Sequence, residues 1–199
     1  MRKKLFSNGM TVVELLVTLL IFSMLTTVLF SMFGAARSIW YSALNRSLEF
    51  EELIIISRDV MFDLRDSNIS SIVNCTVSNP ACPSGSPAGF TFLSAYNQAG
   101  NFVTDANNAS PVWQKHVVYC IQPGTTNILR SEGSVAASIS DRFNNCVARG
   151  KIVAISIVFM QMTENLSSRS ALLSFTVQNK NSFGKTEEHS HNITVSMRN

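Results

Sequence analysis

The first third of the chain carries one continuous helical pattern that changes from wholly apolar to amphipathic. Residues 10–33 read MTVVELLVTLLIFSMLTTVLFSMF and contain a single charged side chain, Glu14. About 20 apolar residues are enough for a helix to cross a bilayer, so this segment predicts a membrane-spanning helix. Residues 34–66 contain no proline, and we expect them to continue the same helix, with a bend allowed at Gly34.

The outer part of this helix has an apolar stripe and a charged face. Apolar and small residues recur there at three- and four-residue steps, which predicts one face packed on a core. The stripe consists of Phe50, Leu53, Ile54, Ser57, Val60, Met61 and Leu64. The charged side chains fall on the other positions and predict a solvated face: Glu49, Glu51, Glu52, Arg58, Asp59, Asp63 and Arg65.

The rest of the chain has the pattern of strands. Residues 67–87 are rich in Ser, Pro, Asn and Gly and indicate a break. Beyond it, alternating and β-branched runs predict strands at residues 90–95, 111–121, 151–162, 171–178 and 191–197. Because helices do not alternate with these strands, the pattern favours an antiparallel sheet. We therefore expect an α+β fold, in which the long N-terminal helix packs on an antiparallel β-sheet.

Charge indicates how the apolar helix is oriented. Arg2, Lys3 and Lys4 precede it, so the positive-inside rule places the N-terminus in the cytoplasm and the remainder outside. A cleaved signal peptide ending near the small residues 34–36 is the alternative, but its apolar region would be shorter, about 7–15 residues. Without these three residues the chain has 13 basic and 13 acidic side chains, which argues against nucleic-acid binding.

The junction before the apolar segment, Gly9-Met10-Thr11-Val12-Val13-Glu14, resembles the leader of type IV prepilins and type II secretion pseudopilins. This resemblance implies a leader of residues 1–9, cleavage between Gly9 and Met10 by a prepilin peptidase, and N-methylation of Met10. Glu14 would then be the fifth mature residue. Residues four apart are neighbours on a helix, so Glu14 could pair with the Met10 ammonium of its own subunit. The resemblance implies an assembly salt bridge with the Met10 ammonium of a neighbouring subunit instead. The family usually begins its mature chain with Phe, so Met10 departs from the pattern.

The resemblance also implies a pilin-like organisation. Residues 10–33 would be a transmembrane and filament-core helix, residues 34–66 its amphipathic half, and residues 67–199 a periplasmic or extracellular β-rich domain. The protein would be a single-pass inner-membrane protein that later enters a pilus or pseudopilus. Its partners would be other pilin or pseudopilin subunits, the prepilin peptidase and the inner-membrane assembly platform.

Three functional alternatives remain open at this point. The favoured one is a structural minor pilin of a type IV pilus-like filament. The others are a minor pseudopilin of a type II secretion system and a tip pilin that binds a ligand or DNA. Residues 117–121 followed by 128–130 resemble a hairpin of minor pilins and J-type minor pseudopilins, and residues 193–199 resemble their closing strand.

Four cysteines, Cys75, Cys82, Cys120 and Cys146, fit disulfides in an oxidising compartment. Three pairings are open. We favour Cys75–Cys82 and Cys120–Cys146, because each closes a local loop around turn residues. A zinc site would want closely spaced cysteine pairs, and no C-x2-C occurs.

Other groups predict little chemistry. His189 and His191 share a strand face near Glu187, but two histidines near a terminus are usually surface residues, so we expect no metal. The oxygen-rich run at Asp105, Asn107 and Asn108 lacks a calcium-loop pattern. The basic residues considered for DNA contact, Arg142, Arg149 and Lys151, are expected to be solvated charges. With no catalytic motif, we expect neither an enzyme nor a cofactor.

Overall fold

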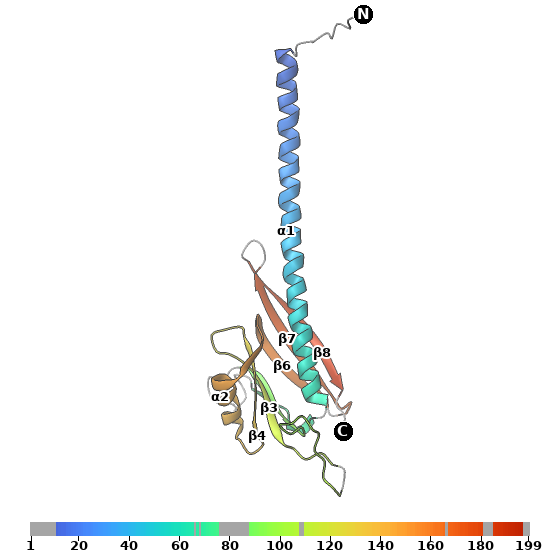
Figure 1. Ribbon diagram of the computed structural model, residues 1–199, viewed down its shortest axis with the longest axis vertical. Coiled ribbons are helices and arrows are strands. Elements are labelled where there is room, and N and C mark those ends of the chain that lie inside the picture. Colours follow the sequence, from blue (N-terminus) through green and yellow to red (C-terminus); the bar gives the residue numbers. More distant parts are fainter. Residues whose placement is uncertain are drawn as a thin grey trace, which may run out of the picture. The chain divides into compact units, whose positions relative to one another are not determined.

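The computed structural model describes residues 11–65, 67, 69–75, 88–107, 110–165, 167–180 and 185–196. The chain divides into two units, Met1–Leu44 and Asn45–Asn199. In chain order the elements are α1 (Val12–Arg65), a 3-10 turn η1 (Ile69–Ser71), β1 (Val73–Cys75), β2 (Gly89–Ser94), β3 (Lys115–Ile121), β4 (Ile128–Ser134), α2 (Ile139–Arg149), β5 (Lys151–Ala154), β6 (Ile157–Asn165), β7 (Ser170–Lys180) and β8 (Thr186–Ser196) (Figure 1).

The first unit consists of the apolar part of α1. The helix passes Gly34 without interruption, so the prediction of one continuous helix is confirmed over Val12–Arg65; Met10 and Asp66 lie outside the described residues. Within its stretch Val12–Leu44, the most apolar 18-residue window has a mean hydropathy of 2.4 and contains no buried residue. Within the described residues this is the one helix long and apolar enough to cross a membrane.

In the second unit, the last turns of α1 pack on strands through a narrower stripe than the sequence predicts. The buried helix positions are Leu53, Ile56, Ser57, Val60 and Leu64. Phe50, Ile54 and Met61, which the periodicity placed in the stripe, keep 55%, 64% and 37% of their surface exposed. That part of the prediction is wrong, because the sheet covers only the positions nearest the line through Leu53, Val60 and Leu64.

The strands form two antiparallel sheets, where the sequence favoured one. One sheet has the order β1-β2-β3-β4-β5 and the other the order β6-β7-β8. The expected hairpin is confirmed, since β3 and β4 pair antiparallel with Ile121 opposite Ile128. The last strand is longer than expected: β8 begins at Thr186 and pairs along the whole of β7. The α+β class with antiparallel sheets is therefore confirmed.

The prediction of a single strand over residues 151–162 is wrong. These residues form β5 and the first part of β6, which belong to different sheets. Ser156 lies between them with a φ of 63°, a left-handed conformation that side-chain-bearing residues adopt rarely and that ends an extended run. Residues 152–160 are apolar except for Ser156. Composition alone therefore does not show where the chain leaves the first sheet and enters the second.

Helix α2 was not predicted. Ser138 is its N-cap and accepts a hydrogen bond from the backbone N–H of Asp141, and Gly150 follows its last residue. Its buried residues Phe143 and Cys146 are three apart, as on one helical face. The Ser-x-x-Asp cap and this spacing are the sequence signals that could have identified the helix.

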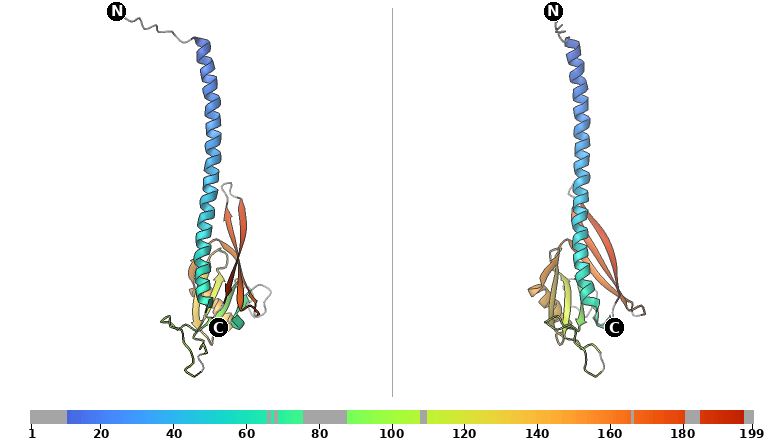
Figure 2. Two further views of the ribbon diagram at one scale, coloured as in Figure 1. Left: turned by 90° about the vertical axis from the view of Figure 1, so that its right-hand side faces the viewer. Right: turned by 45° about the vertical axis from the view of Figure 1, so that its right-hand side comes forward.

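The five-stranded sheet separates two cores. One face packs with Val60 and Leu64 of α1 and with β6 and β7 in a large cluster that includes Phe90, Phe92 and Phe175. The opposite face carries α2, around the cluster of Val118, Leu129, Phe143 and the cysteines. Figure 1 shows β3 and β4 between α2 and the end of α1, and Figure 2 shows the orange and red strands alongside that teal end of the helix.

Candidate functional site

The start of α1 is closed by reciprocal hydrogen bonds between Thr11 and Glu14. Thr11 Oγ1 accepts from the backbone N–H of Glu14 at 3.3 Å, and Glu14 Oε2 accepts from the backbone N–H of Thr11 at 3.2 Å. This capping box satisfies N–H groups that the first turn leaves without helical partners, and it places a carboxylate at the positive end of the helix dipole. The Thr-x-x-Glu spacing therefore explains why the helix begins at Val12, and sequence reasoning missed it.

The other residues of the predicted processing site are not placed. Gly9 and Met10, predicted for cleavage and methylation, lie outside the described residues. Glu14 is exposed, and its carboxylate accepts hydrogen bonds from Thr11. The predicted pairing of Glu14 with the Met10 ammonium therefore stays a prediction.

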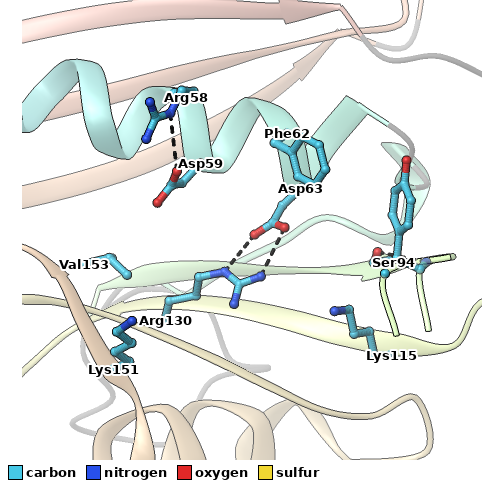
Figure 3. A pocket seen from close by; sticks show the side chains of 11 residues that line it. Arg58, Asp59, Phe62, Asp63, Ser94, Lys115, Arg130, Lys151 and Val153 are labelled. Carbon is cyan, nitrogen blue, oxygen red and sulfur yellow. Dashed lines mark hydrogen bonds and ion pairs between the residues drawn. The ribbon is translucent and has the colours of Figure 1, made fainter. Parts of the chain in front are cut away.

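An ionic network ties the last turns of α1 to β3 and β4. Arg130 donates from Nε to Asp63 Oδ2 at 2.8 Å and from Nη2 to Asp63 Oδ1 at 3.1 Å. Its Nη2 also lies 2.6 Å from Glu132 Oε1, whose second oxygen lies 2.7 Å from Lys115 Nζ. Tyr119 Oη donates to Asp63 Oδ2 at 2.7 Å. Figure 3 shows the two bonds between Arg130 and Asp63, a bidentate geometry that makes for a strong charge-assisted pair.

The network shifts the proton affinities of its members. Burial raises the pKa of the Tyr119 hydroxyl far above its ordinary value, and the neighbouring Asp63 carboxylate adds to this. Burial alone would lower the pKa of Arg130, but its hydrogen bonds to Asp63 and the charge of that carboxylate reverse the direction and raise it. Burial opposes ionisation of Glu132, yet Lys115 and Arg130 outweigh it and lower the pKa of Glu132. All three groups are therefore held in their ordinary neutral-pH charge states.

A cavity of about 570 Å³ opens beside this network, which we call the Arg130 pocket. It lies in the second unit, with the helix as one wall and strands β2 to β5 as the other. Its lining residues are Arg58, Asp59, Phe62, Asp63, Ser94, Tyr96, Gly100, Lys115, Arg130, Lys151 and Val153. In Figure 3 the side chains of Asp59 and Asp63 point from the helix towards Arg130 on the sheet.

Sequence reasoning did not find this pocket. It placed Asp63 on a solvated helix face, whereas the Asp63 side chain is 14% exposed and paired with Arg130. That part of the prediction is wrong. The pair joins residues 67 positions apart, and helical periodicity alone cannot show which strand residue will face a helix position. The available signal was local: Asp63 directly precedes the buried Leu64.

The cysteines follow the predicted pairing where the structure describes them. Cys120 on β3 and Cys146 on α2 form a disulfide, which confirms that pair and leaves neither thiol for zinc. Cys75 is also disulfide-bonded, while Cys82 lies outside the described residues. The Cys120–Cys146 bond therefore fastens α2 to the face of the five-stranded sheet.

The remaining candidates do not gather into a site. His189 Nε2 lies 4.0 Å from Glu187 Oε2, and His191 packs edge-on against Phe50. Across the described residues, no group of three or more His, Cys, Asp or Glu side chains is placed to hold a metal ion. Asp105 Oδ1 accepts a long hydrogen bond from the backbone N–H of Asn107, and Asn108 lies outside the described residues.

The basic residues considered for DNA contact have different surroundings. Arg142 donates to the backbone carbonyl oxygens of Ala137 and Val135, so it is a structural residue of the turn before α2. Arg149 ends α2, and Lys151 lines the Arg130 pocket.

No protein-family model, curated protein or solved structure matches the chain. The functional interpretation therefore depends on the helix, the cap and the pocket themselves.

Proposed function

We propose that the protein is a structural minor subunit of a type IV pilus-like filament. It is made as an inner-membrane precursor, and a prepilin peptidase removes residues 1–9. The observation that carries this proposal is the apolar helix Val12–Leu44, whose side chains have no protein cover and whose first turn holds a lone carboxylate.

The exposed apolar surface requires a partner environment. Phe22, Phe30 and Phe33 keep 68%, 72% and 70% of their surface exposed. The other large apolar side chains of the segment are exposed as well. Apolar surface of this extent is stable in lipid or against other apolar helices, and it causes aggregation in water. A filament subunit uses both environments in turn, first the bilayer and then the core of the assembled fibre.

The carboxylate supports the same proposal. A charged group within an apolar segment is costly in a membrane and is retained where it has a function. Cleavage after Gly9 would create an ammonium at Met10, the residue next to Thr11, whose backbone and hydroxyl hold Glu14. The cap thus keeps the carboxylate near the new amino group, where it can pair with the same subunit's ammonium or with a neighbour's.

Two variants of Glu14 separate the charge from the cap. Glutamine can accept the hydrogen bond from Thr11, so Glu14→Gln keeps the capping box and removes the charge, whereas Glu14→Val removes both. We expect both variants to reach the inner membrane and both to be depleted from filaments sheared from cells. Thr18→Val is the matched control, because Thr18 bonds only to the backbone carbonyl of Leu15 and should assemble normally.

The outcomes decide the proposal as follows. If Glu14→Gln enters filaments at the wild-type level, the charge has no role in assembly and the pairing with Met10 is wrong. If the wild-type protein is absent from sheared filaments, and loss of its gene instead blocks protein secretion, the subunit belongs to a type II secretion pseudopilus. Neither result is expected.

A further inference from the structure

The Arg130 pocket has an unbalanced set of charges. Arg130 and Lys115 are engaged by Asp63 and Glu132 at 2.6–2.8 Å. Arg58 and Asp59 form a loose pair at 3.8 Å. Lys151 also lines the pocket, and it has no ion pair with any described residue. Four cationic side chains line the pocket, and their carboxylate partners are three: Asp59 and Asp63 in the lining and Glu132 beside it. The cation left over, Lys151, is on an exposed residue at the pocket wall.

The pocket also has an aromatic wall. Phe62 keeps 67% of its surface exposed and stacks on Tyr96, with ring centroids 6.1 Å apart and an interplanar angle of 23°. Tyr96 in turn meets the edge of Phe102, and both Phe62 and Tyr96 line the cavity. An exposed ring held in place by a second ring presents a rigid apolar face at low entropic cost to a ligand that stacks on it.

Hydrogen-bond acceptors complete the lining. Asp59 is half-buried and forms only a long ion pair with the exposed Arg58 among the described residues, so its carboxylate can accept hydrogen bonds from ligand hydroxyl groups. In Figure 3 Asp59 and Lys151 lie towards one side of Arg130, and Phe62 and Lys115 lie towards the other. The cavity volume of about 570 Å³ is within the usual range for small ligands, about 300–1,000 Å³.

We propose that the Arg130 pocket binds a hexuronic acid residue of an acidic polysaccharide. The sugar carboxylate pairs with Lys151, the apolar face of the pyranose ring stacks on Phe62, and ring hydroxyls donate to Asp59. This combination distinguishes a uronic acid from its competitors. A neutral sugar leaves Lys151 without a partner. A DNA strand such as oligothymidylate has no free sugar hydroxyl groups within the chain, so its sugars cannot donate to Asp59. The proposal does not depend on the filament role.

The test uses the full chain in detergent micelles and titrates it with tetragalacturonate by isothermal calorimetry. Maltotetraose supplies the same ring size without carboxylates, and a short oligothymidylate supplies the nucleic-acid comparison. We expect tetragalacturonate to bind at least about tenfold more tightly than maltotetraose, since a charge-assisted contact contributes that much or more. Weaker or equal binding of tetragalacturonate relative to either comparison would overturn the proposal.

Variants assign the binding to this pocket. Lys151→Gln and Phe62→Ala should each weaken tetragalacturonate binding about tenfold. Both side chains are exposed, so the fold should tolerate both changes, which circular dichroism checks. Arg149→Gln removes one positive charge at the end of α2 and should leave the affinity unchanged. An equal effect of Arg149→Gln and Lys151→Gln, or no effect of Lys151→Gln, would contradict a site at Lys151.

Discussion

Replacement of Arg130 by methionine should destabilise the second unit strongly, because Arg130 is the cation that the helix and the sheet share. The substitution keeps much of the side-chain length and removes the charge and its donors. It leaves the Asp63 carboxylate with the hydrogen bond from the Tyr119 hydroxyl, and leaves Glu132 with Lys115. An ionised group that loses its partner in a partly buried site retains the cost of its desolvation.

The magnitude follows from the exposure of the two side chains. Breaking a fully buried ion pair costs about 3–5 kcal/mol, and breaking an exposed one costs about 0–1 kcal/mol. The side chains of Arg130 and Asp63 are 26% and 14% exposed, which places this pair nearer to the buried limit. We therefore expect the free energy of unfolding to fall by about 2–3 kcal/mol in Arg130→Met.

The matched control is Arg58→Met. Arg58 and Asp59 are on the same helix, 3.8 Å apart, with side chains 73% and 42% exposed, so this change should cost less than about 0.5 kcal/mol. Urea unfolding of the full chain in detergent micelles, followed by near-ultraviolet circular dichroism, compares the two variants. The double variant Asp63→Asn/Arg130→Met should lose less than the sum of the single losses. Equal losses for Arg58→Met and Arg130→Met, or strict additivity in the double variant, would refute a partly buried pair.

Three further predictions concern the second unit. Cys120→Ser/Cys146→Ser opens a loop with a sequence separation of 26 and should lower the free energy of unfolding by about 3.5 kcal/mol. Urea titration of this variant, compared with the oxidised and the reduced wild type, measures the loss. Burial lowers the pKa of His116 in the folded protein below its ordinary value of 6.5. The unfolded chain therefore binds a proton at His116 more readily than the folded protein does, and the free energy of unfolding should fall as the pH drops below 6.5. A urea midpoint that is flat from pH 7 to 5, or that falls equally in His116→Gln, would contradict this assignment. Leu64→Ala should cost about 2–5 kcal/mol, because Leu64 is fully buried; a cost under 1 kcal/mol by the same titration would show that the helix is not held through this position.

The sequence predicts the elements with strong local patterns. The apolar run and the residues after it predict one helix through Gly34, because a helix with no proline and a three-to-four residue period has no competing local structure. The hairpin of β3 and β4 was expected from its resemblance to a hairpin of minor pilins, whereas β4 itself was not among the strands that the alternating pattern predicts. The Cys120–Cys146 pair was visible because of its local spacing, although the helix that carries Cys146 was not.

What the sequence does not predict depends on contacts between distant residues. Asp63 has the same periodicity as its solvated neighbours, and only Arg130 on a strand 67 residues away makes it a partly buried group. The division of residues 151–162 between two sheets depends on the backbone conformation of Ser156, which its residue type does not favour. The Arg130 pocket combines a helix, strands and a loop, so no local window contains it.

The central claim, that this chain is a processed filament subunit, is tested most directly at its N-terminus. The protein is purified from membranes of its native cells, and its intact mass and N-terminal sequence are determined. The proposal predicts a chain that begins at Met10, with one added methyl group on its amine and Glu14 as the fifth residue. A chain that begins near Arg37, as after signal-peptide cleavage, or one that retains residues 1–9, would contradict it.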